Sequence, residues 1–130
     1  MKLGRLSDVE MEVMQAIWGL ANPVTVAELL VIFEDSKGWK TSTIATMLER
    51  IKAKGFLHKE MKGKANYYSV VATLADYQRQ EGRNIISSLY GGSVKNFMTA
   101  FAEDGNMTAA DVAELRDWFA RSIGEDGDLK

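Results

Sequence analysis

Short hydroxyl side chains and one arginine are spaced to lie on one face of a helix that is predicted to end at Gly55. At about 100° per residue, Ser42, Thr43, Thr46 and Arg50 fall on the side opposite to an apolar stripe. Small hydroxyl-bearing residues allow a helix to approach base edges closely, and the Arg50 guanidinium can bind a guanine or a phosphate through two hydrogen bonds. These residues therefore predict recognition of nucleic acid. The apolar stripe consists of Ile44, Met47, Leu48 and Ile51.

Two lysines flank a glycine in the predicted turn Lys62-Gly63-Lys64, between β-prone runs at residues 56–61 and 66–71. A hairpin would place both ammonium groups at its tip, where a phosphate backbone can pass. Basic residues gather between Lys40 and Lys64, although the formal net charge of the chain is −2. This asymmetry indicates a localised anion-binding surface, and a solvated charged face is the alternative.

The residue types that most enzymes and metal sites require are scarce in this chain. It contains no cysteine, and His58 is its one histidine. This composition excludes disulfides, thiolate nucleophiles and cysteine-based zinc or copper sites. A hydrolase needs a nucleophile beside a base, whereas Ser7, Ser42 and Ser69 are expected to act as helix caps or strand residues. We therefore expect no catalytic residues, no metal site and no cofactor.

The composition of the chain is that of a soluble globular protein. It has 130 residues, of which 46% are hydrophobic and 26% are charged. No apolar run approaches the roughly 20 residues that a membrane-spanning helix needs. The first residues, MKLGRLSDVE, lack the apolar segment of a secretory signal. A cytoplasmic protein without membrane insertion is the expectation.

Helix start signals define the elements that must position the basic and hydroxyl residues. Ser7 with Glu10 and Thr25 with Glu28 fit capping boxes, and the second helix is predicted to run to about Asp35. Three helices followed by a two-stranded hairpin is the order of a winged helix-turn-helix, whose third helix enters the major groove while the hairpin lies over phosphates. The predicted DNA-binding residues are Thr41, Ser42, Thr43, Thr46, Arg50, Lys62, Lys64 and Tyr67.

After Ala72 the pattern is helical only. Helices are predicted from Thr73 to Tyr90, over residues 93–102, and from Thr108 onwards. They are too few, and too apolar on one face, to form a separate core, so pairing with a second subunit would bury them. The predicted fold is mainly α with a small β-hairpin: a winged-helix DNA-binding domain (1–72) followed by a C-terminal helical dimerisation region (73–130). The predicted dimerisation residues are Ile86, Leu89, Tyr90, Val94, Phe97, Phe101, Leu115, Trp118 and Phe119.

Residues spread over positions 5–120 follow one family pattern, whose most specific stretch runs from Trp39 to Gly55. They are Leu6-Ser7, Glu10, Glu12-Val13-Met14, Ile17-Trp18, Val26-Ala27-Glu28-Leu29, Trp39, Thr43-Ile44, Thr46, Leu48, Arg50, Lys54-Gly55, Tyr67-Tyr68, Tyr90-Gly91-Gly92 and Glu114-Leu115. On these residues the chain resembles the penicillinase repressor (BlaI/MecI) family, which includes the copper-responsive CopY branch. The resemblance implies a homodimeric transcriptional repressor that binds a palindromic operator in double-stranded DNA and dimerises through its C-terminal helices.

The chain departs from that family at one operator contact and at the sites through which its members are induced. Penicillinase repressors carry Pro-Lys-Thr where this chain has Thr41-Ser42-Thr43, so one basic contact with the operator is missing. Their Asn-Phe cleavage site aligns with Ala100-Phe101, and the nearby Asn96-Phe97 lies upstream of it. The cysteine cluster of the CopY branch is absent. We therefore expect induction by a small-molecule inducer or partner, or by a regulatory protease that cuts a different bond.

One residue opposes DNA binding and keeps a second function class open. Glu49 lies at the edge of the predicted DNA-facing surface and would repel phosphates unless it accepts a hydrogen bond from a cytosine amine. The alternative function is a winged-helix protein-interaction module that does not bind DNA. The basic turn and Arg50 favour DNA, and salt-dependent retention on a heparin or DNA column would distinguish the two functions.

Overall fold

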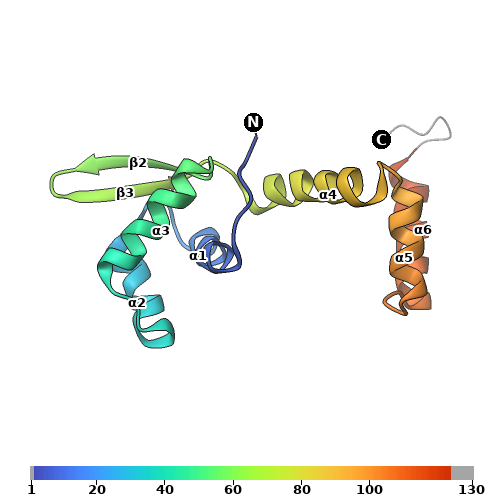
Figure 1. The fold of residues 1–130 in the computed structure, drawn as a ribbon, viewed down its shortest axis with the longest axis horizontal. Coiled ribbons are helices and arrows are strands. Elements are labelled where there is room, and N and C mark those ends of the chain that lie inside the picture. The colour runs from blue at the N-terminus through green and yellow to red at the C-terminus, as the bar shows by residue number, and fades with distance from the viewer. Residues whose placement is uncertain (1, 124–130) are drawn as a thin grey trace. The chain divides into compact units, whose positions relative to one another are not determined.

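The computed structural model describes residues 2–123, which form two compact units divided between Asn84 and Ile85 (Figure 1). The first unit contains α1 (Asp8–Trp18), β1 (Val24–Thr25), α2 (Val26–Lys37), α3 (Thr41–Ala53), β2 (Leu57–Lys62), β3 (Ala65–Val70) and the first part of α4 (Leu74–Tyr90). The second unit contains the end of α4, α5 (Val94–Glu103) and α6 (Ala109–Ser122). No helix of the described residues is long and apolar enough to span a membrane.

Both predicted capping boxes of the first unit are formed. Ser7 Oγ accepts a hydrogen bond from the Glu10 amide at 3.2 Å, and Glu10 Oε1 accepts one from the Ser7 amide at 2.8 Å. Thr25 and Glu28 make the equivalent pair at the start of α2. These bonds satisfy amides that have no partner within the helix. Helix α2 continues past Asp35 to Lys37, and Gly38, at φ 67°, ends it in the left-handed conformation that favours glycine.

The apolar stripe of α3 is buried, as its spacing predicts. Ile44, Leu48 and Ile51 are at most 1% exposed, and they pack in one core with residues of α1, α2 and the hairpin. Full burial of such a side chain contributes about 1.5–3 kcal/mol each, so the core fixes the rotation of α3 about its axis. The opposite face of α3 is thereby left in solvent. Other large side chains that are fully buried are Val13, Met14, Ile17, Val24, Leu29, Phe56 and Tyr68.

The sheet has three strands, in the order β1-β3-β2, where the sequence predicts a two-stranded hairpin. Strands β2 and β3 form the predicted antiparallel hairpin, and Gly63, at φ 63°, lies in its turn. The additional strand β1 pairs Val24 with Tyr68 and Thr25 with Tyr67. It is missed by sequence reasoning because a strand of only 2 residues shows no alternation, and Thr25 also caps α2.

The first unit extends past Ala72, where the sequence places the end of the winged-helix domain. Tyr77 and Gln80 of α4 are 8% and 9% exposed, and both belong to the interior of this unit. The predicted cap of α4 is confirmed, because Thr73 Oγ1 accepts a hydrogen bond from the Asp76 amide. The early turns of α4 are therefore part of the same compact unit as α3.

The second unit has helices with well-formed starts but no buried side chains among its described residues. Ser93 caps α5, and Thr108 forms a capping box with Asp111 at the start of α6. These starts confirm the predicted ones. No residue of α5 or α6 is buried, and large apolar side chains such as Val94 and Trp118 are 60% and 44% exposed.

Candidate nucleic-acid interface

The hydroxyl-rich face of α3 is exposed along its whole length. Thr41, Ser42, Thr43, Thr46 and Arg50 all lie in solvent, opposite to the buried stripe. Thr46 donates a hydrogen bond from its hydroxyl to the Ser42 carbonyl at 2.9 Å, which holds that side chain close to the helix. The result is a helix face with short side chains and one long cationic one, a shape that fits a major groove.

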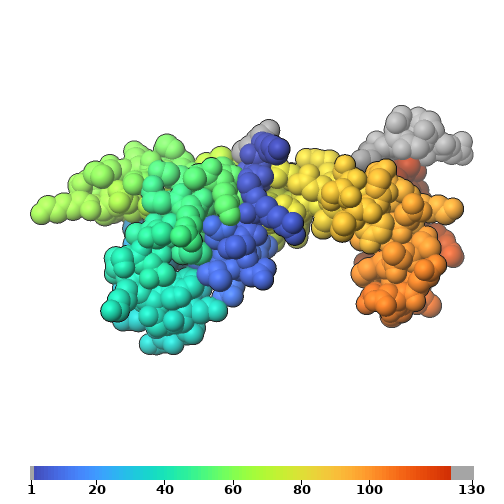
Figure 2. All heavy atoms as spheres, in the orientation of Figure 1, coloured from blue at the N-terminus to red at the C-terminus, as the bar shows by residue number. Residues whose placement is uncertain are grey.

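The basic turn lies at the end of a hairpin that projects beyond the helices of the first unit (Figures 1 and 2). Lys62 and Lys64 are both exposed there. The Lys62 ammonium lies 5.8 Å from the centre of the half-buried Tyr67 ring, which is a distance at which a cation–π interaction stabilises the charge. The predicted wing residues Lys62, Lys64 and Tyr67 therefore lie together near the hairpin turn. Within the described residues, no hydrogen bond or ion pair joins them to α3.

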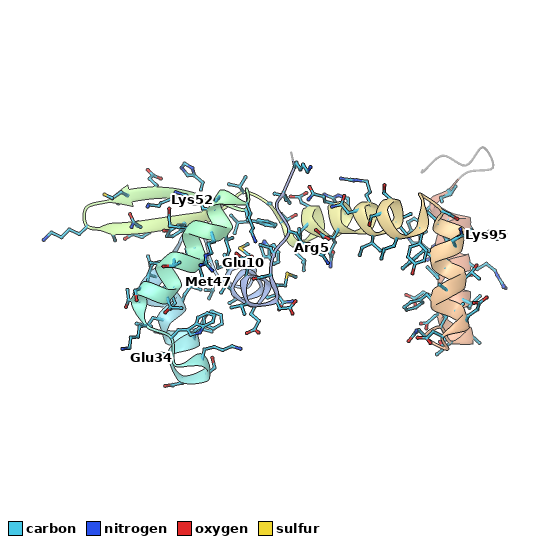
Figure 3. All side chains as sticks on the ribbon, viewed as in Figure 1. Arg5, Glu10, Glu34, Met47, Lys52 and Lys95 are labelled. Carbon is cyan, nitrogen blue, oxygen red and sulfur yellow. The ribbon has the colours of Figure 1, made fainter. Side chains whose placement is uncertain are left out.

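Glu49 connects α3 to the hairpin, a role that the sequence did not predict. Its Oε2 accepts hydrogen bonds from the Tyr68 hydroxyl at 2.8 Å and from Lys59 Nζ at 3.3 Å. Its Oε1 pairs with Lys52 Nζ at 2.9 Å; Figure 3 labels Lys52 on α3 beside the hairpin. Lys59 and Tyr68 are cross-strand partners, so one carboxylate holds both strands against the helix. The negative charge that opposed DNA binding is thus neutralised within the protein.

This cluster keeps the Glu49 carboxylate ionised and the Tyr68 hydroxyl protonated. Hydrogen bonds from Lys52, Tyr68 and Lys59 lower the pKa of Glu49 from 4.5 to about 2, against a smaller opposing effect of burial. Burial and the neighbouring Glu49 raise the pKa of Tyr68 to about 12. Across the neutral pH range the charge distribution beside α3 is therefore fixed. The signal for this cluster was the register of the hairpin, which composition and helix spacing do not reveal.

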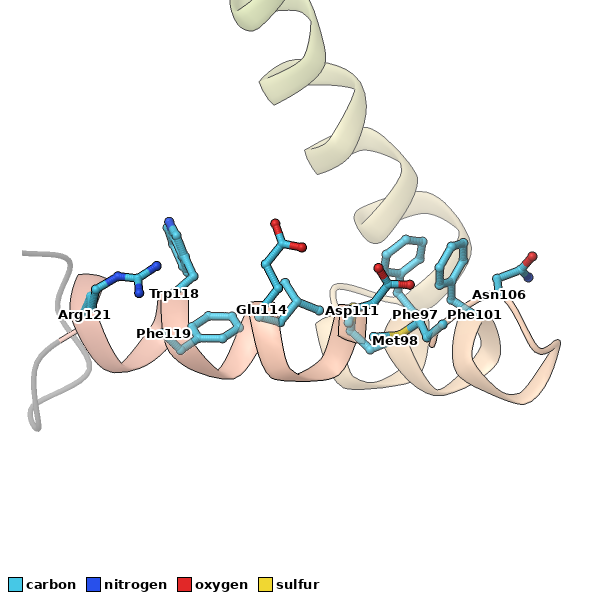
Figure 4. A pocket seen from close by; sticks show the side chains of 11 residues that line it. Phe97, Met98, Phe101, Asn106, Asp111, Glu114, Trp118, Phe119 and Arg121 are labelled. Atoms are coloured by element: carbon cyan, nitrogen blue, oxygen red, sulfur yellow. The ribbon is translucent and has the colours of Figure 1, made fainter. Parts of the chain in front are cut away.

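A groove lies on the second unit between α5 and α6, lined by Phe97, Phe101, Trp118 and Phe119 among others (Figure 4). Its volume is about 850 Å³. Neighbouring rings contact one another, with 6.1 Å between the Phe97 and Phe101 centres and 5.1 Å between those of Trp118 and Phe119. Of the predicted dimerisation residues, the exposed ones are Leu89, Val94, Phe101, Leu115, Trp118 and Phe119, and the half-buried ones are Ile86, Tyr90 and Phe97.

Comparison with known proteins identifies the family. Residues 6–121 match the family described as penicillinase repressor. The chain belongs to the penicillinase repressor family. This result confirms the resemblance deduced from the sequence, and because the members of this family are repressors rather than enzymes, the chain is not an enzyme.

Two curated family members and one solved structure illustrate the similarity. The penicillinase repressor of Bacillus licheniformis is 26% identical over 114 residues, which cover 88% of each chain. The methicillin resistance regulatory protein MecI of Staphylococcus aureus (strain N315) is 28% identical over 116 residues, covering 88% of this chain and 93% of that one. The DNA-binding domain of the repressor BlaI has a TM-score of 0.51 and 32% identity over 59% of this chain and 94% of that domain. The predicted fold, mainly helical with a winged helix-turn-helix, is therefore confirmed.

Proposed function

We propose that this member of the penicillinase repressor family is a homodimeric transcriptional repressor that binds a palindromic operator. The observation that carries the proposal is the two-sided character of α3 within a unit similar to the BlaI DNA-binding domain. Its buried face anchors the helix, and its exposed face presents Ser42, Thr43, Thr46 and Arg50. A fixed helix with such a face is suited to contact base edges in the major groove.

The roles of the exposed residues follow from their chemistry. Arg50 recognises a base, because a guanidinium can bind guanine O6 and N7 together. Thr41, Ser42, Thr43 and Thr46 contribute short hydrogen-bonding groups to the same groove. The wing residues Lys62 and Lys64, with Tyr67 beside them, bind the phosphate backbone and carry no base preference.

A second copy of the chain is proposed to cover the apolar face of the second unit. In soluble proteins, a contiguous cluster of exposed large apolar side chains often marks a site of interaction with another protein. Phe101 and Trp118 are each 44% exposed and Phe119 is 50% exposed, and their rings line the groove between α5 and α6. A symmetric pair would bury these rings and present two copies of α3 to the two halves of a palindrome.

Induction is proposed to act through the second unit. The Ala100-Phe101 bond lies inside α5 (Val94–Glu103), so a protease that cut it would first have to open a helix. The pair also lacks the asparagine that the family carries before the cut. A small-molecule inducer at the dimer helices, or a regulatory protease that cuts another bond, is therefore the proposed route. Mass analysis of the chain recovered from β-lactam-treated cells tests it, and a fragment ending at Ala100 would contradict it.

Selection of bound duplexes from a random DNA pool tests the central proposal. The full chain should enrich a sequence with dyad symmetry, and its affinity should fall by about 10³-fold or more between 50 and 200 mM salt. Replacing Lys62 and Lys64 together by Gln should flatten the salt dependence by about 0.9 in slope for each phosphate contact removed. Lys95→Gln, on α5, is the matched control and should leave the slope unchanged. Failure to enrich any sequence would favour the protein-interaction alternative.

A further inference from the structure

The N-terminal segment, residues 3–6, is hydrogen-bonded to the early turns of α4. The Leu3 amide donates to Gln80 Oε1 at 2.9 Å, and Gln80 Nε2 donates to the Leu3 carbonyl at 2.6 Å. The Leu6 amide donates to the Tyr77 hydroxyl at 2.9 Å. One glutamine side chain thus pairs with both backbone groups of a single residue, as a neighbouring strand would. Figures 1 and 2 show this segment, in blue, beside the start of α4, in yellow.

The same segment is fixed on its other side to the end of α3. The Gly4 amide donates to the carbonyl of Lys54, the C-cap residue of α3, at 2.9 Å. Lys54 Nζ donates in turn to the Arg5 carbonyl at 2.8 Å and to the buried Glu10 carboxylate (Figure 3 labels Arg5 and Glu10). A Cβ at Gly4 would lie 2.8 Å from Lys54 Cγ, so this close approach requires glycine.

Burial makes these connections rigid. Leu3, Leu6, Tyr77 and Gln80 are each at most 9% exposed, and the Tyr77 ring packs edge-on against Phe56 at 5.1 Å. Hydrogen bonds in such surroundings are stronger than in water, and removing one partner leaves the other buried and unpaired. The segment therefore joins the end of α3 to the beginning of α4, and its hydrogen bonds to α4 are buried.

Helix α4 is the element that continues from the first unit into the second. We propose that Gln80 is a positioning residue that fixes the direction in which α4 leaves the DNA-binding unit, and thereby sets the half-site spacing that the dimer accepts. The inference rests on the proposed function, because it requires two copies on two half-sites. Inserting one base pair between half-sites turns one of them by about 36°, since a helical turn takes about 10 base pairs. If α4 is held rigidly, the dimer should lose affinity for the altered duplex, whereas a dimer with a loosened α4 should lose less.

The experiment compares full-length variants on duplexes of different spacing. The probes are the duplex obtained by selection, the same duplex with one or two base pairs inserted at its centre, and a single half-site. Gln80→Leu removes both hydrogen bonds to Leu3 and leaves an apolar side chain of similar size at the buried position. Gln78→Leu is the matched control, because it makes the same substitution at an exposed position of α4. Tyr77→Phe removes only the bond to Leu6 and retains the ring.

The wild type and Gln78→Leu should lose at least about tenfold in affinity on insertion of one base pair, because the second half-site no longer adds its effective concentration. Gln80→Leu should lose less than about threefold on the same insertion, while its half-site affinity stays within about twofold of the wild type. The loss of affinity that one inserted base pair causes in Tyr77→Phe should lie between that of the wild type and that of Gln80→Leu. It replaces Gln80→Leu as the decisive variant if the latter no longer binds a half-site.

The same data distinguish three results that would count against these proposals. Wild-type spacing discrimination in Gln80→Leu, or in Tyr77→Phe where that variant decides, overturns the positioning role. A wild type that sediments as a monomer, or binds full and half-sites alike, overturns the proposed function first. In whichever of the two variants decides, a loss of half-site affinity that parallels the loss of full-site affinity would assign Gln80 a merely structural role and equally reject the inference.

Discussion

The two units of the chain solve the burial of apolar side chains in different ways. In the first, Ile44 and Tyr68 are 1% and 2% exposed, and they belong to one continuous core. In the second, Trp118 and Phe119 are 44% and 50% exposed, although their helix, α6, starts with a capping box as α1 and α2 do. Capping signals therefore predict where helices begin, but they do not predict whether those helices bury their apolar side chains. The first unit buries its apolar side chains in its own core, whereas α5 and α6 of the second unit bury none of theirs.

Truncation gives the largest expected separation between the two units. A chain that ends at Asn84 should fold and sediment as a monomer, because it retains the core together with Tyr77 and Gln80. Its affinity for a full palindrome should fall by about 10²-fold or more, since two half-sites are no longer bound by one linked pair. A chain that ends at Ala72 lacks both α4 residues and should be less stable to urea. A dimer formed by residues 1–84 would contradict the assignment of the interface to the second unit.

Placing a charge on each unit's exposed apolar surface gives the next largest effect. Leu115 is 36% exposed on α6, and Val31 is 77% exposed on α2. If a second copy covers Leu115, Leu115→Glu would bury a carboxylate at the interface and should raise the dimer dissociation constant by about a hundredfold. Val31→Glu adds the same charge at a site that stays in solvent and should change that constant by less than about twofold. Analytical ultracentrifugation measures both, and equal effects would break the comparison.

Substitutions on the DNA-facing surface should act without changing dimerisation. Arg50→Ala should cost about 1–3 kcal/mol in operator binding and relax the preference at one base position. Lys64→Ala should weaken all sequences alike and reduce the salt dependence, because a phosphate contact carries no sequence information. Competition with single-base operator variants separates the two residues. The assignment of reader and phosphate contact is wrong if both variants lose specificity equally.

Acid should weaken the first unit through Glu49, and this is the smallest expected effect. Because folding lowers the pKa of Glu49 from 4.5 to about 2, its ionised form stabilises the fold above pH 4.5, and that contribution is lost as the pH falls towards 2. Its side chain is 44% exposed, so solvent screening limits the contribution to about 1 kcal/mol or less. The free energy of unfolding by urea should be lower for Glu49→Gln than for the wild type at pH 6, and the two values should converge near pH 2. Glu60→Gln, on the exposed side of β2, should have a smaller effect at pH 6.

Local signals predicted most of the fold because they act over a few residues. The capping boxes at Ser7 and Thr25 depend on side chains three residues apart, and the buried face of α3 depends on helical periodicity alone. The exposed positions of Thr46, Arg50 and the two wing lysines follow from the same patterns. The winged-helix order and most of the candidate interface could therefore be predicted from the sequence.

What sequence reasoning missed depends on contacts between distant residues. Strand β1 exists because β3 offers Tyr67 and Tyr68 as partners, and nothing local distinguishes Val24 and Thr25 as a strand. The neutralisation of Glu49 requires the register that brings Lys59 and Tyr68 together. No periodicity in α4 indicates that the Gln80 side chain would hydrogen-bond to the backbone of Leu3.

That pairing has a consequence for the order in which the first unit folds. Leu3 and Gln80 are 77 positions apart, so their hydrogen bonds can form only after most of the first unit is ordered. Contacts of such long sequence separation slow folding, because the intervening chain must be ordered before they close. The helices and the hairpin, by contrast, are closed by neighbours in sequence. Residues 3–6 should thus be the last part of the unit to become protected from hydrogen exchange during refolding.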